Sequence, residues 1–469
     1  MADQQALESA SGVTVALARA VRATRFDDLP PDVVYLAKQC FLDWLGVTLA
    51  GSGEPLARML RDEVAEEGGN AQATLIGTGE RVTTAQAALV NGAASHALDF
   101  DDVVMAMSGH PTVPVAPGLL AIAEQRRASG RDFIAAFVAG FEMECRAGAL
   151  VMPGHYTAGW HATGTLGTFG SAAACAHLLG LDEEQWLHAL GIAGAQAAGL
   201  KSMFGTMCKP LHAGKAAANG LLAATLAQRG FTSNTEVFET PQGFGATQTT
   251  TLNPQQALAG LGEGHGIRGV LFKYHAACYG THETIEGVLR LKERHGLQAG
   301  DVRAIRLKVP PGNLNMCNIQ EPRTALEGKF SLRFTAALAL AGEGTGEQAF
   351  TDAAVATPAL VAVRDRVSVE ARTALESPTG SGIGAGTEVT LTLADGRDLR
   401  EFVNLDIPAT DLDQQWRRLE AKFMSLAIPV VGEGRARELV EAVRGLDSAG
   451  SMAEVVRLAV APGRVGAPA

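Results

Sequence analysis

Apolar residues recur with a helical period along most of the chain. The apolar positions of residues 33–45 follow a 3.6-residue repeat that begins after Pro30 and ends before Gly51, which predicts a helix. A second helix is predicted over Pro55–Glu67, and helix follows helix from Leu119 to about Arg229. Because no βαβ alternation occurs in that stretch, the pattern argues against a Rossmann core.

The pattern changes after about Gly266. Residues 302–309 alternate as a strand, residues 363–370 contain a second short strand, and residues 388–393 and 399–403 flank an Ala-Asp-Gly-Arg turn typical of a hairpin. Helical periodicity resumes at Leu412. The pattern therefore predicts a mostly α fold, in which a large discontinuous helical domain of residues 1–266 and 405–469 encloses a smaller α+β domain of residues 267–404.

The strongest polar interruption lies in residues 91–118. A predicted helix of small residues, 91–98, is followed by Asp99, Asp101 and Asp102, and His110 comes eight residues later. Pro114 and Pro117 predict a non-helical segment up to Leu119. One interpretation is a helix-capping cluster with a loop histidine. The functional hypothesis is a pocket wall in which a carboxylate orients a histidine for acid–base work.

Two further segments carry polar groups next to predicted helices. His161 lies between glycines at a helix start, either pointing into a cleft or buried and satisfied by hydrogen bonds. Lys209 and His212 precede a predicted Ala-rich helix of residues 215–228, where a helix N-terminus favours anion binding. The alternative for this segment is a surface turn.

Residues 272–282 lie at the predicted junction of the two domains and contain Lys273, His275 and Cys278. A lysine in a partly desolvated cleft can lose its proton near neutral pH and act as a base. We expect His161 and Lys273 to lie across one cleft, with Asp99 and His110 beside them.

Charge and composition narrow the class of protein. The formal net charge is −11, and no run of Lys or Arg is present, which argues against nucleic acid and against a membrane surface as partners. Six scattered cysteines and a polar N-terminus predict a cytoplasmic protein with reduced thiols. The spacings typical of metal ligands, a phosphate loop or a nucleophilic-serine elbow do not occur, so no metal and no nucleotide cofactor is predicted.

Several segments together resemble the MmgE/PrpD family, which includes 2-methylcitrate dehydratases, cis-aconitate decarboxylases and iminodisuccinate epimerases. They occur in the family's order and extend over nearly the full chain. The matching segments are FLDWLGVTLAGS (41–52), NGAASHALDFDD (91–102), GHPTVPVAPG (109–118), GWHATGTLGTFGSAAAC (159–175), KPLHAGKAAANG (209–220), GFGATQ (243–248), FKYHAACYGTH (272–282) and KFSLRF (329–334).

The resemblance implies a helical domain of discontinuous sequence, a smaller α+β lid domain, a homodimer, and no metal or organic cofactor. The family's catalytic positions fall on five residues of this chain. They are Asp99, His110, His161, Lys209 and Lys273.

Three positions depart from the family pattern. Val103 replaces a frequent Thr, Cys278 replaces a histidine of the decarboxylases, and Phe334, which follows Arg333 instead of a proline, replaces a common Tyr. Each change removes a hydrogen-bonding or proton-transfer group, which argues against the decarboxylase and methylcitrate dehydratase activities. A proton-abstraction site of His, Lys and an orienting Asp remains.

The sequence thus predicts a cofactor-free lyase or isomerase that removes a proton alpha to a carboxylate or carbonyl of a small polycarboxylate-like substrate, giving epimerisation or dehydration. One alternative is isomerisation or cyclisation of a larger, less polar substrate in a specialised biosynthetic pathway. Another is a catalytically silent binding protein. The residues predicted to bind substrate are His212, His275, Cys278, Met203 and Phe334.

Overall fold

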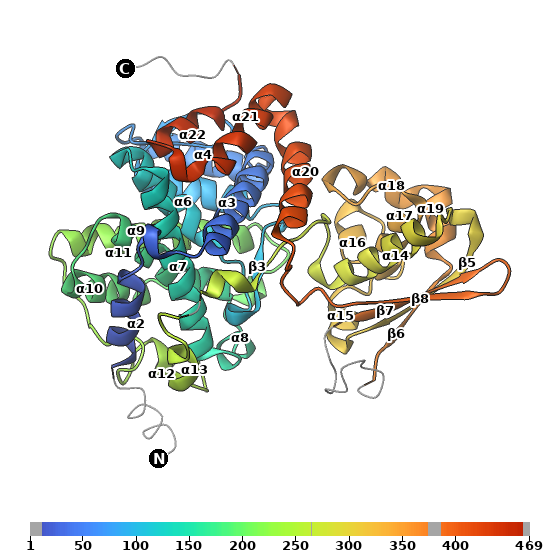
Figure 1. Ribbon diagram of the computed structural model, residues 1–469, viewed down its shortest axis with the longest axis horizontal. Helices are drawn as coiled ribbons and strands as arrows, with labels where there is room; N and C mark the ends of the chain where they lie inside the picture. Colours follow the sequence, from blue (N-terminus) through green and yellow to red (C-terminus); the bar gives the residue numbers. More distant parts are fainter. Residues whose placement is uncertain (1–11, 264, 374–385, 463–469) are drawn as a thin grey trace. The chain divides into compact units, whose positions relative to one another are not determined.

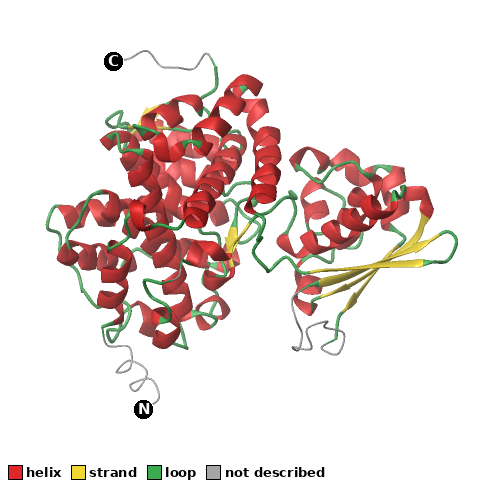
Figure 2. Ribbon diagram, viewed as in Figure 1, coloured by secondary structure: helices red, strands yellow, loops and turns green. Residues whose placement is uncertain are grey.

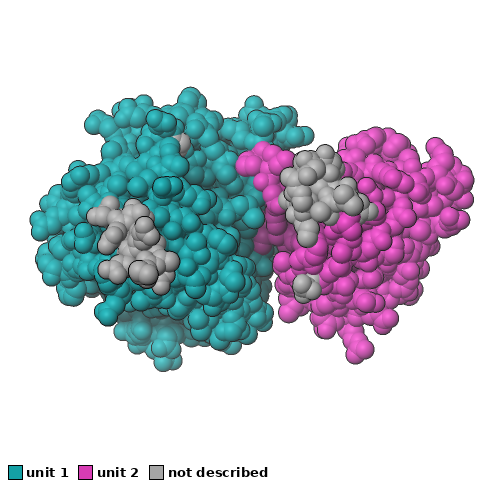
Figure 3. Space-filling model, turned by 90° about the horizontal axis from the view of Figure 1, so that it is seen from below, with its two compact units in different colours: residues 1–272, 409–469 teal, residues 273–408 magenta. Residues whose placement is uncertain are grey.

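The computed structural model describes residues 12–263, 265–373 and 386–462. The chain divides into two compact units, which Figure 3 shows in different colours. Unit 1 contains residues 1–272 and 409–469, and unit 2 contains residues 273–408. The sequence pattern had put the smaller domain at residues 267–404.

Unit 1 is a helical body in which α5, α6, α7, α9 and α11 pack against one another (Figure 1). Its helices are α2 (Val13–Arg22), α3 (Pro31–Gly51), α4 (Pro55–Glu67), α5 (Thr84–Ser95), α6 (Thr112–Arg126), α7 (Gly130–Val151), α8 (Gly154–Thr157), α9 (Ala162–Leu178), α10 (Glu183–Gly194), α11 (Cys208–Gln228), α12 (Phe244–Gln248), α13 (Pro254–Leu258), α20 (Leu412–Val431), α21 (Glu433–Arg444) and α22 (Met452–Leu458). Unit 1 also contains two short pairs of antiparallel strands. They are β1 (Ala73–Thr74) with β2 (Arg81–Val82) and β3 (Val103–Val104) with β4 (Val270–Leu271).

Two glycines let α5 and α11 approach closely. A Cβ on Gly92 of α5 would lie 2.7 Å from the Cα of Gly214 in α11, so a larger residue at this crossing would push the helices apart. The start of α5 is also well defined, because Thr83 and Gln86 form a capping box. The C-terminal end of α5 and the N-terminal end of α11 carry the candidate site.

The prolines after His110 do not delay the next helix, which corrects one sequence prediction. Helix α6 begins at Thr112 and includes both Pro114 and Pro117. Pro114 lies in the first turn, where backbone N–H groups have no intrahelical acceptor, so it removes no hydrogen bond. Pro117 does lie inside the helix, which is almost entirely buried. Packing of this buried helix outweighs the loss of one backbone bond.

Helix α11 corrects a second prediction. It begins at Cys208, so Lys209 and His212 are part of its first two turns and do not precede it. Pro210 occupies the first turn, where proline is tolerated. Lys209 and His212 are therefore held by a regular helix, which fixes the direction of both side chains.

Helix α3 is long and apolar enough to cross a membrane, but 83% of its most apolar window is buried in the fold. It packs against α5, α6, α7 and α20. These contacts are those of a core helix of unit 1.

Unit 2 combines a sheet with helices. The sheet order is β6-β5-β7-β8, with β5 and β6 parallel and the other neighbours antiparallel. Helices α14 and α17 pack on one another and against the sheet (Figure 2). The elements are α14 (His282–His295), β5 (Val302–Val309), α15 (Pro311–Met316), α16 (Ala325–Lys329), α17 (Leu332–Ala341), α18 (Asp352–Ala356), α19 (Pro358–Arg364), β6 (Val367–Ala371), β7 (Thr387–Leu393) and β8 (Asp398–Val403). A mostly α fold with small sheets is confirmed.

Candidate active site

A short loop between α5 and β3 carries most of the polar groups of the candidate site. Helix α5 ends at Ser95, three residues earlier than predicted, and His96 caps it. The chain then turns at Asp99, whose φ of 51° lies in the left-handed region. Asp tolerates this conformation better than most residues. The turn brings Asp101 back beside His96.

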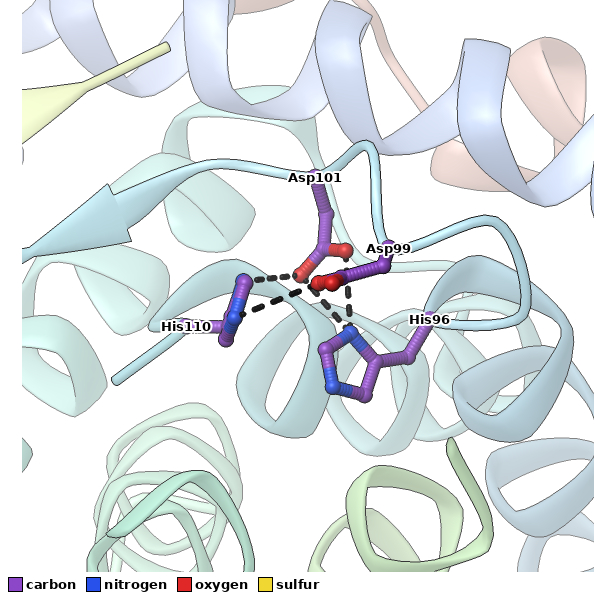
Figure 4. Close-up of side chains that lie close together, drawn as sticks. All are labelled: His96, Asp99, Asp101 and His110. Carbon is purple, nitrogen blue, oxygen red and sulfur yellow. Dashed lines mark hydrogen bonds and ion pairs between the residues drawn. The ribbon is translucent and has the colours of Figure 1, made fainter. Parts of the chain in front are cut away.

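One carboxylate binds two imidazoles at the centre of the loop (Figure 4). Asp101 Oδ1 lies 2.9 Å from His96 Nδ1, and Asp101 Oδ2 lies 2.8 Å from His110 Nδ1. Asp101 and His96 are each 1% exposed. Burial alone would raise the pKa of Asp101, but the interactions with His110 and His96 outweigh it and hold this pKa well below its ordinary value. Asp101 is therefore ionised at neutral pH.

The proton of neutral His110 is directed to Nδ1. Besides Asp101, the backbone carbonyl oxygen of Asp102 lies 2.9 Å from His110 Nδ1. Both neighbours only accept hydrogen bonds, so Nδ1 carries the hydrogen and Nε2 keeps its lone pair. The backbone N–H of His110 donates to Thr163 Oγ1 in the first turn of α9, which anchors the residue.

Asp99 joins the histidines to a cation from α11. Lys209 Nζ lies 2.8 Å from Asp99 Oδ1, and His110 Nε2 lies 3.6 Å from the same oxygen. The second distance is too long for a hydrogen bond. The lone pair of His110 therefore faces a region that already contains an ammonium group, which can attract a substrate carboxylate.

Two more histidines extend the cluster. His161, the N-cap residue of α9, lies with Nδ1 3.0 Å from Nδ1 of His212 in α11, and its ring stacks on that of His96 at 5.9 Å. Burial, followed by the nearby His96 and Lys209, lowers the pKa of His161 far below its ordinary value, and burial also lowers the pKa of His212. Both rings are neutral at pH 7, so one donates a hydrogen bond to the other. Phe204 meets the ring of His161 edge-on at 5.0 Å.

Asp102 differs from its neighbour Asp101. Burial, followed by the negative charge of Asp43, raises the pKa of Asp102 to about 8. It accepts hydrogen bonds from the backbone N–H and the hydroxyl of Thr112 at the start of α6. Asp102 is thus mostly protonated at neutral pH and ties the loop to α6.

Four of these groups lie close enough for a metal ion to be considered. Among the described residues, ligand atoms of His96, Asp99, Asp101 and His110 lie within 4.8 Å of one another. A cation at this point would have to displace the Lys209 ammonium from Asp99 and two imidazole N–H groups from Asp101. We therefore interpret His96, Asp101 and His110 as a hydrogen-bond network and Asp99 as the partner of Lys209.

The remaining predicted residues belong to unit 2. Lys273 is its first residue and is 2% exposed. His275 is buried, with Nδ1 2.7 Å from Thr345 Oγ1 and Nε2 3.1 Å from Glu286 Oε1. Cys278 Sγ lies 3.4 Å from Met316 Sδ, and Phe334 is buried against Phe350.

Comparison with known proteins gives the family. The MmgE/PrpD N-terminal domain matches residues 15–257, and the MmgE/PrpD C-terminal domain matches residues 275–448. The chain belongs to the MmgE/PrpD family.

Relatives within the MmgE/PrpD family are similar over nearly their whole length. A cis-aconitate decarboxylase-like protein oryM of Aspergillus oryzae is 26% identical over 95% of this chain and 97% of its own. The human cis-aconitate decarboxylase is 27% identical over 93% of this chain and 92% of its own. The cis-aconitate decarboxylase of Aspergillus terreus is 26% identical over 96% of both chains.

The structure brings together most of the positions that the MmgE/PrpD resemblance implies. Asp99, His110, His161 and Lys209 lie in one cluster of unit 1, with His212 behind His161, whereas Lys273 lies in unit 2. Met203 lies in the segment between α10 and α11, next to Phe204.

His96 is the residue of the cluster that the sequence reasoning missed. It had been taken as part of a helix of small residues, although a polar aromatic residue in such a run is itself a signal. Asp101 had been noticed without a specific partner, and the five-residue separation from His96 gives no hint of contact until the turn at Asp99 is known.

Proposed function

We propose that this protein is a lyase or isomerase that removes a proton from the carbon next to a carboxylate of a small polycarboxylate, without a metal or organic cofactor. The observation that carries the proposal is the state of His110. Its Nδ1 donates to Asp101 and to the carbonyl oxygen of Asp102, which leaves Nε2 as a base beside the Lys209 ammonium.

Each group has a defined part in the proton transfer. Nε2 of His110 takes the proton, and the electron pair of the broken C–H bond moves into the adjacent carboxylate to form an enolate. Asp101 stabilises the imidazolium that results, as an orienting carboxylate does for other catalytic histidines. Lys209 stabilises the negative charge that develops on the substrate oxygen.

The same intermediate leads to two products. Expulsion of a hydroxide from the β carbon gives an alkene and, with the proton that the base removed, water. Return of the proton to the opposite face gives the epimer. The relatives that are named for a polycarboxylate substrate support a polycarboxylate as the substrate. The changes at Val103, Cys278 and Phe334 argue against its decarboxylation and against methylcitrate dehydration.

The test is incorporation of solvent deuterium into a panel of di- and tricarboxylates, with and without a β-hydroxyl group, followed by NMR. We expect exchange at the carbon next to a carboxylate in at least one compound. Exchange should persist in excess chelator. A panel in which no compound exchanges, or exchange that is lost on chelation and restored by one metal, would contradict the proposal.

A second candidate function is supported by exposed apolar side chains in the segment that precedes α11. Phe204 and Met207 are 39% and 50% exposed, and Phe204 contacts the His161 ring. Such a surface favours a larger, less polar substrate that is isomerised or cyclised by the same base. Replacing both residues by Ser distinguishes the two functions, because it should weaken binding of an apolar substrate and leave exchange into a polycarboxylate nearly unchanged.

A further inference from the structure

Asp101 is shared between two histidines in a way that the proposed reaction does not require. An orienting carboxylate needs one imidazole partner, yet Asp101 contacts two. Its Oδ2 lies 2.8 Å from His110 Nδ1, and His96 Nδ1 lies 2.9 Å from Oδ1 and 3.1 Å from Oδ2. The role of His96 in this arrangement is unassigned.

His96 contacts the carboxylate of Asp101 through its Nδ1 atom. Because ionised Asp101 only accepts hydrogen bonds, the hydrogen of neutral His96 lies on Nδ1. Its Nε2 is buried and has no hydrogen-bond partner among the described residues, and Figure 4 shows it on the side of the ring away from Asp101. The side chain is 0% exposed, so a substrate does not reach it directly.

We propose that Asp101 and His96 are positioning residues for His110: Asp101 orients the base, and His96 limits the attraction between Asp101 and the protonated base. The proposal rests on the proposed function of His110. The three residues form a relay, His96–Asp101–His110, in which His96 donates to Asp101 and its ring also packs edge-on against that of His110 at 4.5 Å.

The physical reason is competition for one negative charge. A hydrogen bond from His96 stabilises the ionised form of Asp101 and reduces its pull on the proton of His110. Burial, opposed by Asp101, lowers the pKa of His96 to about 4, so His96 is a neutral donor at pH 7. Without that donor, the full charge of Asp101 would act on His110, which would then hold its proton more tightly and release it less readily.

Other charged and titratable groups also face His110. They come from the loop itself, from α9 and from α11, and they are Asp99, Asp102, His161, Lys209 and, behind His161, His212. Because these groups are the same in every variant, a difference between two variants reports the change at His96 or Asp101.

The experiment is an NMR titration of the histidine Cε1–H groups in the full-length protein, with His110 assigned by its absence in His110→Gln. Three variants are compared with the parent. Asp101→Asn removes the charge, so His110 should titrate at lower pH by about 1 unit or more. His96→Phe keeps a ring but removes the donor, so His110 should titrate at higher pH, by roughly 0.5–1 unit.

His96→Asn is the matched control. The amide nitrogen of Asn can occupy the place of Nδ1 and donate to Asp101, but no group replaces Nε2. His110 in this variant should titrate within about 0.3 units of the parent. The midpoint of the acid limb in the pH profile of kcat/KM should shift in the same order as the NMR midpoints. If His96 and Asp101 served only in folding, their variants would not shift the titration of His110 in opposite directions.

Two results would overturn the relay. One is a shift of His110 in the same direction for Asp101→Asn and His96→Phe. The other is a His96→Asn shift as large as that of His96→Phe. If circular dichroism finds Asp101→Asn unfolded, the comparison of the two His96 variants decides alone. Opposite NMR shifts with no exchange into any polycarboxylate would support the relay and contradict the proposed function.

Discussion

The ammonium of Lys422 donates a hydrogen bond of 2.6 Å to the carbonyl oxygen of Phe100, 322 positions earlier in the chain. Lys422 lies in α20, the first helix after the chain returns from unit 2, and it also lies over the Phe100 ring. Phe100 stands between Asp99 and Asp101, so a C-terminal helix holds the loop that carries the site.

Replacing Lys422 by Met should destabilise unit 1. Lys422 also pairs with Asp43 at 2.6 Å, and both side chains are almost fully buried. Loss of one partner leaves a buried charge, which typically costs about 3–5 kcal/mol. Urea unfolding monitored by circular dichroism would measure the change. The double variant Asp43→Asn/Lys422→Met should recover part of the loss, and a single variant within about 1 kcal/mol of the parent would contradict the importance of the pair.

Lys209→Ala should reduce turnover as well as binding. If Lys209 stabilises the enolate, its removal should lower kcat by about 10²–10³-fold, the usual effect of losing one such stabilising group. The control is Lys215→Ala, which changes an exposed lysine on the same helix. A rise in KM with unchanged kcat would restrict Lys209 to substrate binding.

Asp102→Asn should change the pH dependence of stability. A carboxyl group whose pKa rises from 3.8 to about 8 on folding stabilises the fold fully at acidic pH, and this contribution is lost as pH rises through about 8. The parent should therefore lose up to about 1.4 kcal/mol per pH unit from this group between pH 5 and pH 7.5.

The measurement is urea unfolding of the parent and of Asp102→Asn at pH 5, 6.5 and 7.5. Asn keeps the acceptor for Thr112 but does not titrate, so the variant should gain stability relative to the parent as pH rises. Other titrating groups cancel in the difference. A difference that stays constant with pH would show that Asp102 is ionised in the folded protein.

The sequence predicted individual elements well where local signals were strong. The bounds of α4 and β5 match the prediction, because prolines and a clear period of 3.6 or 2 define them. The prediction failed at Pro114 and Pro117, where proline was interpreted as a helix breaker. Pro114 lies in the first turn of α6, and whether a turn is the first depends on packing that the local sequence does not contain.

The candidate site could be predicted only in part. Motif resemblance identified Asp99, His110, His161 and Lys209, which lie together in unit 1. The contact of His96 with Asp101 depends on the left-handed turn at Asp99, and periodicity cannot predict that turn. The roles of Lys273 and of the other unit 2 residues stay predictions.

Solvent deuterium incorporation with and without the imidazole of His110 tests the proposed base most directly. The variant is His110→Gln, whose amide nitrogen lies near the position of Nε2 but cannot accept a proton at neutral pH. The control is His295→Gln, which changes an exposed histidine at the end of α14. We predict that the first variant loses about 10²–10⁴-fold in exchange rate and that the second keeps the parent rate. The account would be contradicted if His110→Gln exchanged within about threefold of the parent rate, because removal of a proton-transfer group should cause a much larger loss. The base would then be another residue.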